Sequence, residues 1–221
     1  MWLYKLKKFV SSLFYPAKCP YCNKILESDK TVCDECYKKF HVTPLTTDLE
    51  LDYRHSIKVI SAFPYREKIK ESICKFKFKS NLDYVEYFAE SMIKAIKQKG
   101  IVCNFGLITF VPMTKKHKKE RGFNQAQILA KALGKLLDIP VENILLKVKN
   151  NKAQHTLHKS ERVINVKGVY IAKNKEKIKL KNILLCDDIV TTGSTIKECA
   201  LALIDAGAKD VLGITIAKTE K

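Results

Sequence analysis

Beyond residue 100, short apolar runs alternate with longer segments in which apolar residues recur every three or four positions. Continuous apolar runs such as NILLC and VLGITIA are typical of strands in a parallel sheet that is covered on both faces. The longer segments have the periodicity of amphipathic helices. The predicted strands are residues 107–111, 144–148, 168–172, 183–186 and 211–217, and the predicted helices are 124–137 and 195–206. This order of elements predicts an α/β fold with a doubly wound, mainly parallel sheet.

The segment before residue 100 has a less regular pattern. Residues 61–65 look extended, and apolar residues at helical spacing predict helices at 67–78 and 82–98. Residues 44–60 are polar and rich in turn-forming residues, and we interpret them as a linker. The main domain is accordingly expected to span residues 61–221.

Residues 1–18 are predicted to form an amphipathic helix, because apolar residues and lysines fall on different faces of a helical wheel. The apolar stretch is too short for a secretory signal and is interrupted by Ser11 and Ser12. The longest uncharged stretch of the chain, residues 100–114, is shorter than the roughly 20 residues that a bilayer-spanning helix needs, so no membrane span is expected. The amphipathic helix either docks on its own domain or makes a peripheral contact with a membrane or a partner protein.

Four of the eight cysteines form two Cys-x-x-Cys pairs, Cys19 with Cys22 and Cys33 with Cys36, with ten residues between the pairs. Two such pairs can bring four thiolates to one tetrahedral zinc ion, so we predict a zinc ribbon at residues 19–43. Zinc would be structural there, because four thiolates leave no position for water or substrate. A redox dithiol pair and two disulfides are the alternatives. The other cysteines are single residues in apolar surroundings, which favours reduced thiols and a cytoplasmic location.

The loop after the predicted strand 183–186 contains the most informative residues of the chain. Asp187 and Asp188 follow the strand directly, and the sequence Thr-Thr-Gly-Ser-Thr at 191–195 leads into the next predicted helix. The amino terminus of a helix offers unpaired N–H groups and a positive dipole to a phosphate, while two carboxylates can hold a diol or a metal ion. The chain contains neither G-x-x-x-x-G-K-[ST] nor G-x-G-x-x-G, so it is not a P-loop or dinucleotide-binding protein.

Two further loops follow predicted strands, where doubly wound folds bind their ligands. The loop after residue 111 is cationic and would offer a pyrophosphate the side chains of Lys115, Lys116, Lys118, Lys119 and Arg121, just before Gly122. The loop after residue 148 is long and polar, as lids often are, and contains Gln154, Arg162 and Asn165.

The chain has 41 basic and 23 acidic residues, which gives a formal net charge of +18. Such an excess suits a phosphate-rich partner, whether a nucleic acid, a nucleotide or an anionic membrane surface. A lysine-biased genome explains the same excess without any partner. The charge is therefore consistent with an anionic ligand but does not identify it.

The acidic and threonine-rich loop resembles the signature of type I phosphoribosyltransferases, in which paired acids and a Thr-Thr-Gly-x-Thr turn follow an apolar strand. The resemblance implies that Asp187 and Asp188 hold the ribose diol of phosphoribosyl pyrophosphate together with Mg²⁺. The implied ligands of the 5-phosphate are Thr191, Thr192, Gly193, Ser194 and Thr195, and the implied pyrophosphate loop contains Lys115, Lys116, Arg121 and Gly122.

From about Cys19 to its end, the chain resembles the ComF family. The shared features are the four-cysteine knuckle, Phe63-Pro-Tyr-Arg66, Lys75-Phe-Lys77-Phe78, Arg121-Gly-Phe-Asn-Gln125, the Asp-Asp-Thr-Thr-Gly loop, and Gln154 with Arg162 and Asn165. That family joins a zinc ribbon to a phosphoribosyltransferase-type domain and is associated with bacterial DNA uptake and natural transformation. The resemblance implies phosphoribosyl pyrophosphate and single-stranded DNA as ligands, with a DNA-uptake helicase or a recombination mediator as candidate protein partners.

Three functions fit these residues. The first is a competence protein that binds phosphoribosyl pyrophosphate and single-stranded DNA. The second is an active phosphoribosyltransferase, in which a nucleophile displaces pyrophosphate at C1 of the sugar, and the third is a non-catalytic adaptor. The same pocket serves enzymes and regulators, and the sequence identifies neither an acceptor base nor a catalytic residue nor the oligomeric state.

Overall fold

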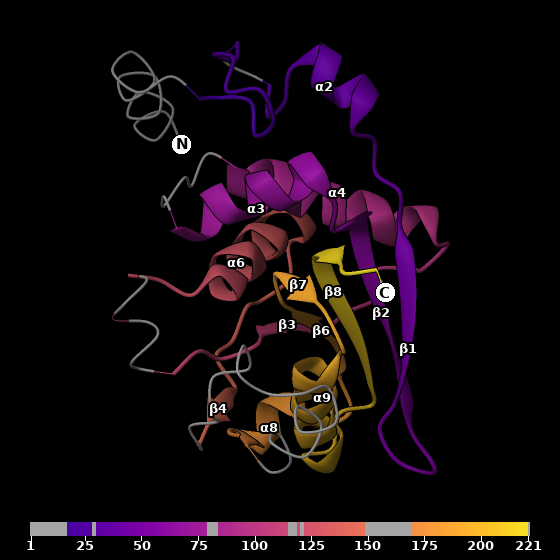
Figure 1. The fold of residues 1–221 in the computed structure, drawn as a ribbon. Coiled ribbons are helices and arrows are strands. Elements are labelled where there is room, and N and C mark those ends of the chain that lie inside the picture. The colour runs from indigo at the N-terminus through magenta and orange to yellow at the C-terminus, as the bar shows by residue number, and fades with distance from the viewer. Residues whose placement is uncertain are drawn as a thin grey trace.

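The computed structural model describes residues 17–27, 30–78, 84–114, 119, 122–148 and 169–220. Helices cover both faces of a central sheet (Figure 1). In chain order the elements are α2 (Asp34–Lys39), β1 (Leu45–Glu50), β2 (Ser56–Pro64), α3 (Glu67–Phe78), α4 (Tyr84–Gln98), β3 (Leu107–Phe110), α6 (Gln125–Leu137), β4 (Leu145–Lys147), β5 (Tyr170–Ala172), α8 (Lys175–Ile178), β6 (Asn182–Cys186), β7 (Ile189–Val190), α9 (Ser194–Asp205) and β8 (Asp210–Lys218).

The central sheet has the strand order β1-β2-β8-β6-β3, and the short β7 pairs with the end of β8. The strands β2, β8, β6 and β3 run parallel, and only β1 is antiparallel to its neighbour. Phe110, Cys186 and Ile214 are in register across β3, β6 and β8. The loops that follow β3 and β6 therefore leave the same edge of the sheet side by side.

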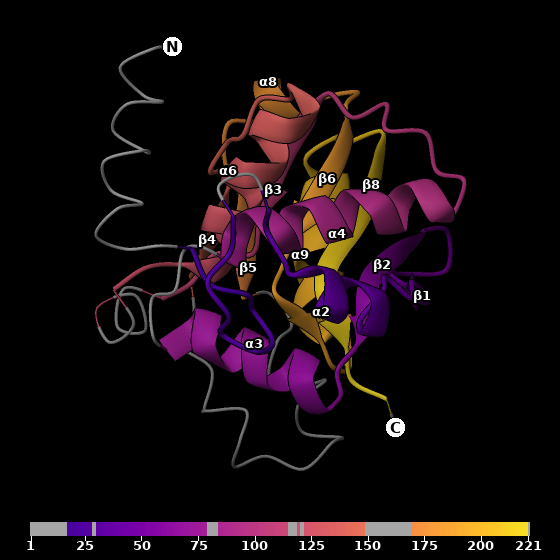
Figure 2. The ribbon, with the colours of Figure 1, turned by 90° about the horizontal axis from the view of Figure 1, so that it is seen from above.

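The two faces of the sheet are covered by different helices, as the doubly wound fold requires. One apolar core joins α3, α4 and α6 to the sheet, with Phe76, Phe88 and Leu129 fully buried in it. The other core lies under α9 and α8 and includes Ile196 and Ile178. The view in Figure 2 shows α3, α4 and α6 on the same side of the sheet. The helix predicted at 67–78 matches α3, and the strand and helix predictions beyond residue 100 match the observed elements within two residues at each described end.

The structure corrects the predicted linker at residues 44–60. Thr46 pairs with Ile60 and Leu49 with Ile57, so this segment forms an antiparallel β1–β2 hairpin that extends the main sheet. The prediction failed because one face of β1 stays half exposed, and its polar residues at alternate positions resemble a linker.

A second difference concerns β4 and β5, which were predicted as strands of the α/β core. They pair antiparallel with each other as a separate two-stranded sheet, with Leu145 opposite Ala172. The run of apolar residues predicted both strands correctly, but such a run does not show which strand each of them pairs with. β5 packs against α9, and this small sheet lies beside the carboxyl edge of the main sheet.

The cysteine-rich segment shares its core with the main domain. Cys19, Tyr21 and Cys36 are buried in the same cluster as residues of α3 and α4. The Tyr21 and Tyr87 hydroxyls lie 2.9 Å apart, and the Ser72 hydroxyl on α3 donates to the Pro20 carbonyl at 2.7 Å. The segment is therefore packed on α3 and α4 as part of one apolar unit.

In the described part of the chain, no helix combines the length and the hydropathy that crossing a bilayer would require. The amphipathic helix predicted for the first residues lies outside the described residues, apart from residues 17 and 18.

Candidate functional site

The two adjacent acids lie at the carboxyl end of β6. The backbone N–H of Asp187 donates to the Ile214 carbonyl at 3.0 Å, so the ladder between β6 and β8 continues one residue beyond the strand. The Asp188 carbonyl accepts from the Ile216 N–H at 3.0 Å. The Asp188 N–H in turn donates to a carboxylate oxygen of Asp187 at 2.8 Å. The sheet thus fixes the backbone of both acids and directs them to the edge where the loops gather.

The threonine-rich loop continues from these acids into the amino terminus of α9. Gly193 precedes the helix in a left-handed conformation, with a φ of 79°. The Thr192 and Ser194 hydroxyls lie 2.9 Å apart, and the first turn of α9 contains no acidic residue. The Ser194 N–H donates only a long bond, 3.4 Å, to the Thr192 hydroxyl. Backbone N–H groups, two hydroxyls and the positive end of the helix dipole therefore meet in one place, an arrangement suited to a phosphate.

Two pockets flank the acids, and Lys77, Asp187 and Asp188 line both of them. The larger pocket has a volume of about 370 Å³ and contains the threonine-rich loop. The smaller pocket, about 180 Å³, lies between the start of the loop after β3, the start of α6 and the end of β4. The other residues of the larger pocket are Tyr65, Ile189, Val190, Thr191, Thr192, Gly193, Ser194, Thr195, Ile196 and Thr219. Those of the smaller pocket are Val111, Pro112, Met113, Thr114, Asn124, Gln125, Ala126 and Lys147.

An ion pair joins α3 to the acidic loop. The Lys77 ammonium lies 2.7 Å from a carboxylate oxygen of Asp188, and the two side chains are only 18% and 16% exposed. Lys77 is therefore not a freely solvated lysine of α3. A partly buried cation is thus held between the two pockets.

The environment of Asp187 differs from that of Asp188. Burial, and secondarily the negative charge of Asp188, raises the pKa of Asp187 to about 8. The raised pKa favours the protonated form of Asp187, whereas the Asp188 carboxylate is paired with the Lys77 ammonium. A divalent cation at this edge would favour ionisation of Asp187, because it stabilises the charged form.

The four cysteines of the two Cys-x-x-Cys pairs form a compact cluster. Their Sγ atoms all lie within 4.8 Å of one another, and those of Cys22 and Cys33 are 3.7 Å apart. Tetrahedral zinc with bonds of about 2.3 Å would separate its sulfur ligands by about 3.8 Å, so the cluster fits one such ion. Cys19 and Cys22 lie on a turn closed by the bridge between Lys18 and Ile25, while Cys33 and Cys36 begin α2.

The thiols of this cluster differ in acidity. Burial acts to raise the pKa of Cys19, but hydrogen bonds from neighbouring backbone groups outweigh it and lower this pKa to about 7. Burial raises the pKa of Cys36, as do the adjacent thiols. A bound metal ion therefore has to displace protons from the cluster. Four thiolates close the coordination sphere, so the cluster can hold a metal in a structural role.

The sequence of this chain is similar to those of several known proteins. The phosphoribosyl transferase domain model matches residues 119–219. Competence protein ComFC of Bacillus subtilis is 29% identical to this chain, over 97% of the chain and 81% of the relative. Competence protein F of Haemophilus influenzae is 26% identical over 90% and 95%, and the DNA utilization protein YhgH of Escherichia coli is 23% identical over 87% and 86%. Over most of its length the chain is therefore similar to competence proteins ComFC and F, and its carboxy-terminal part matches a phosphoribosyl transferase domain. Its main domain has the type I phosphoribosyltransferase fold, preceded by a cysteine cluster that can hold a metal ion.

The structure describes some of the predicted site residues, and the others lie outside the described residues. Asp187, Asp188 and residues 191–195 line the larger pocket together. Gly122 lies in a turn before α6 with a φ of 80°. The residues outside the described part are Lys115, Lys116, Lys118 and Arg121 of the cationic loop and Gln154, Arg162 and Asn165 of the expected lid.

The sequence analysis did not predict two lysines that line these pockets. Lys77 is one of many lysines on a helix, and Lys147 was taken as a strand residue with no role. The only signal for Lys77 was its place in the Lys-Phe-Lys-Phe sequence that the ComF family shares. Nothing in the sequence distinguished Lys147 from a solvated lysine.

Proposed function

We propose that this protein binds phosphoribosyl pyrophosphate with Mg²⁺ and acts in DNA uptake. Its relatives support a role in competence. The observation that carries the ligand is the position of the two acids in the shared wall of two pockets, one of which ends at the amino terminus of α9. The arrangement fits a sugar that carries a phosphate at one end and a pyrophosphate at the other. The phosphate would lie at the start of α9, the sugar at the acids and the pyrophosphate in the smaller pocket.

Each part of the ligand has a group to receive it. The hydroxyls and N–H groups of residues 191–195 are suited to the 5-phosphate. Asp187 and Asp188 would accept the ribose hydroxyls and hold the Mg²⁺, which neutralises charge on the pyrophosphate when it is bound. The loop after Val111 lies on the opposite side of the acids, where the pyrophosphate would extend.

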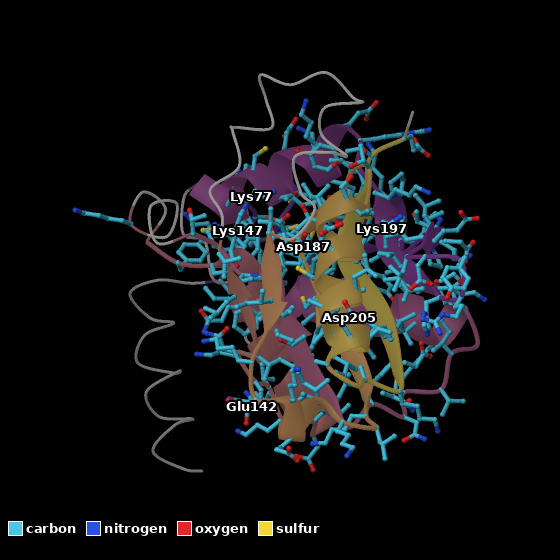
Figure 3. The ribbon with its side chains drawn as sticks, turned by 90° about the horizontal axis from the view of Figure 1, so that it is seen from below. Lys77, Glu142, Lys147, Asp187, Lys197 and Asp205 are labelled. Atoms are coloured by element: carbon cyan, nitrogen blue, oxygen red, sulfur yellow. The ribbon has the colours of Figure 1, made fainter. Side chains whose placement is uncertain are left out.

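Calorimetry with phosphoribosyl pyrophosphate and Mg²⁺ tests this proposal. Wild-type protein is expected to bind, and the Asp187→Asn/Asp188→Asn double variant to bind at least about a hundredfold more weakly, because two amides replace two charged acceptors. Asp205→Asn is the matched control, since Asp205 is an exposed carboxylate at the far end of α9, away from Asp187 (Figure 3). Equal affinity in the wild type and the double variant would reject the site.

A second activity, binding of single-stranded DNA, is favoured by the net charge of +18 and by relatives named for competence and DNA utilization. The basic surface would contact phosphates, and the acidic pocket would take no part. Fluorescence anisotropy with a labelled oligonucleotide is the direct test.

The transferase alternative differs from the binding proposal in one measurable step. A transferase releases pyrophosphate when an acceptor attacks C1, whereas a binding protein leaves the ligand intact. Release of pyrophosphate across candidate bases and nucleic acids, lost in Asp188→Ala, would establish catalysis. The same measurement without release would support a binding or sensing role.

A further inference from the structure

The smaller pocket brings together two lysines from elements outside the main sheet. Lys77 is near the end of α3, and Lys147 is the last residue of β4. Figure 3 shows both lysines beside Asp187 and well away from Glu142. Two lysines from different elements therefore line one small cavity.

Lys147 lies in an unusual environment for a lysine. Its ammonium lies 5.4 Å from the centre of the Tyr170 ring, and burial lowers its pKa. No ion pair joins it to a carboxylate among the residues that the structure describes. A partly buried cation without a carboxylate partner carries a desolvation cost, and an anion bound in the pocket would offset that cost.

The same pocket contains a buried oxygen acceptor that has no hydrogen-bond partner among the described residues. Gln125, at the start of α6, is 1% exposed, and its Nε2 donates to the Lys77 carbonyl at 3.2 Å. Its Oε1 has no hydrogen-bond partner in the described part of the chain. Gln125 thus anchors the backbone that carries Lys77 and leaves an acceptor for a polar ligand, such as a metal-bound water.

We propose that Lys77 and Lys147 together bind the pyrophosphate group of phosphoribosyl pyrophosphate, an inference that rests on the function proposed above. In the free protein Lys77 neutralises Asp188. When Asp187 and Asp188 bind the sugar diol and Mg²⁺, the flexible side chain of Lys77 turns so that its ammonium contacts the pyrophosphate. The pyrophosphate lies in the smaller pocket, which Lys147 also lines. One cation thereby replaces another at Asp188, and the pocket never holds an unpaired carboxylate.

This proposal predicts a preference that a simple structural ion pair would not produce. Ribose 5-phosphate offers the acids and the threonine-rich loop the same groups but lacks the pyrophosphate. Lys77→Gln and Lys147→Gln are each expected to weaken binding of phosphoribosyl pyrophosphate about tenfold or more, the scale of one charge-assisted contact. Binding of ribose 5-phosphate should change by less than about threefold, or strengthen in Lys77→Gln because Asp188 no longer has a competing cation.

Calorimetry with both ligands and Mg²⁺ measures the ratio of the two affinities in each variant. Lys70→Gln, an exposed lysine on the same helix, is the matched control and should leave the ratio unchanged. Lys77→Arg and Lys147→Arg keep the charge and should retain most of the preference, and thermal melts verify that each variant is folded. A wild-type preference for phosphoribosyl pyrophosphate that survives in both glutamine variants would overturn this inference alone. Failure of the wild type to bind either ligand would overturn the proposed function and this inference with it.

Discussion

Gly193 has two independent reasons to be glycine. Its φ of 79° lies in the left-handed region, which residues with a Cβ rarely adopt. An added Cβ would also lie 2.6 Å from a methyl group of Leu49, which the β1–β2 hairpin places over the loop. The hairpin therefore limits the space available to the turn at residues 191–195.

Gly193→Ala is expected to lower the free energy of unfolding by about 1–3 kcal/mol, since backbone strain and the clash with Leu49 add together. It should also weaken binding of ribose 5-phosphate. Denaturant melts and calorimetry measure the two effects. Gly122→Ala is the control, because Gly122 has a similar φ of 80° but open space around its Cβ position. The double variant Leu49→Ala/Gly193→Ala should recover part of the loss, and no recovery would contradict the clash.

The raised pKa of Asp187 makes a prediction about pH. The unfolded chain loses this proton near pH 3.8, whereas the folded protein keeps it up to about pH 8. The folded state therefore binds more protons between these values, so this group reduces the free energy of unfolding as the pH rises from about 4 to about 8.

Asp187→Asn removes that contribution, because its amide stays neutral at every pH. Melts of ligand-free wild type and variant across pH 4–9 should show the variant gaining relative stability with rising pH up to about 8 and constant beyond it. A difference that is independent of pH would show that Asp187 ionises normally in the folded protein.

At the scale of elements, α3 connects the cysteine cluster to the pocket. Ser72 contacts the backbone beside Cys19, and Lys77, further along the same helix, reaches Asp188. A second contact joins the Asn23 side chain to Lys75 of α3 at 3.3 Å. A change in the cluster can therefore alter the position of a pocket residue through a single helix.

Purified protein is expected to contain one zinc ion per chain, and Cys33→Ser to lose it together with several degrees of melting temperature. Elemental analysis and thermal melts measure these effects. Cys103→Ser, a change at a half-buried cysteine outside the cluster, should retain the metal. Iron in place of zinc, or full zinc content in Cys33→Ser, would contradict the assignment.

The sequence predicts best those elements whose own residues carry the signal, whatever they pack against in the fold. Helices such as α6 have their own periodicity and a capping residue, Asn124, whose side chain accepts from the Ala126 N–H. The acids of the candidate site could be predicted because an apolar strand and a helix start border them. β1 and Lys147 could not be predicted, because their roles depend on Gly193 and Tyr170, which are distant in sequence.

At the scale of the whole molecule, the charge of +18 predicts salt-sensitive binding of single-stranded DNA. Lysines that neutralise phosphates release counterions, so the logarithm of affinity should fall linearly with the logarithm of salt concentration. Replacing Lys115, Lys116, Lys118 and Lys119 by alanine should make this slope shallower if the cationic loop contacts DNA.

Asp188→Asn is the control for this experiment, because it should abolish sugar-phosphate binding and leave DNA binding intact. Anisotropy titrations from about 50 mM salt upwards give both affinity and slope, and electrostatic binding is strongest at the low end. Absence of a complex at the lowest salt would reject DNA binding and leave the sugar-phosphate site unaffected.

The burial of Cys19 and Tyr21 in one core with α4 has a consequence for the protein inside a cell. When a metal site has no separate fold, the energy of metal binding is part of the energy of folding. In zinc-starved cells, newly made chains would spend more time open and would be removed faster by proteases. We therefore expect the cellular abundance of this protein to follow the zinc supply, so that the availability of a nutrient metal would set how much of it is present.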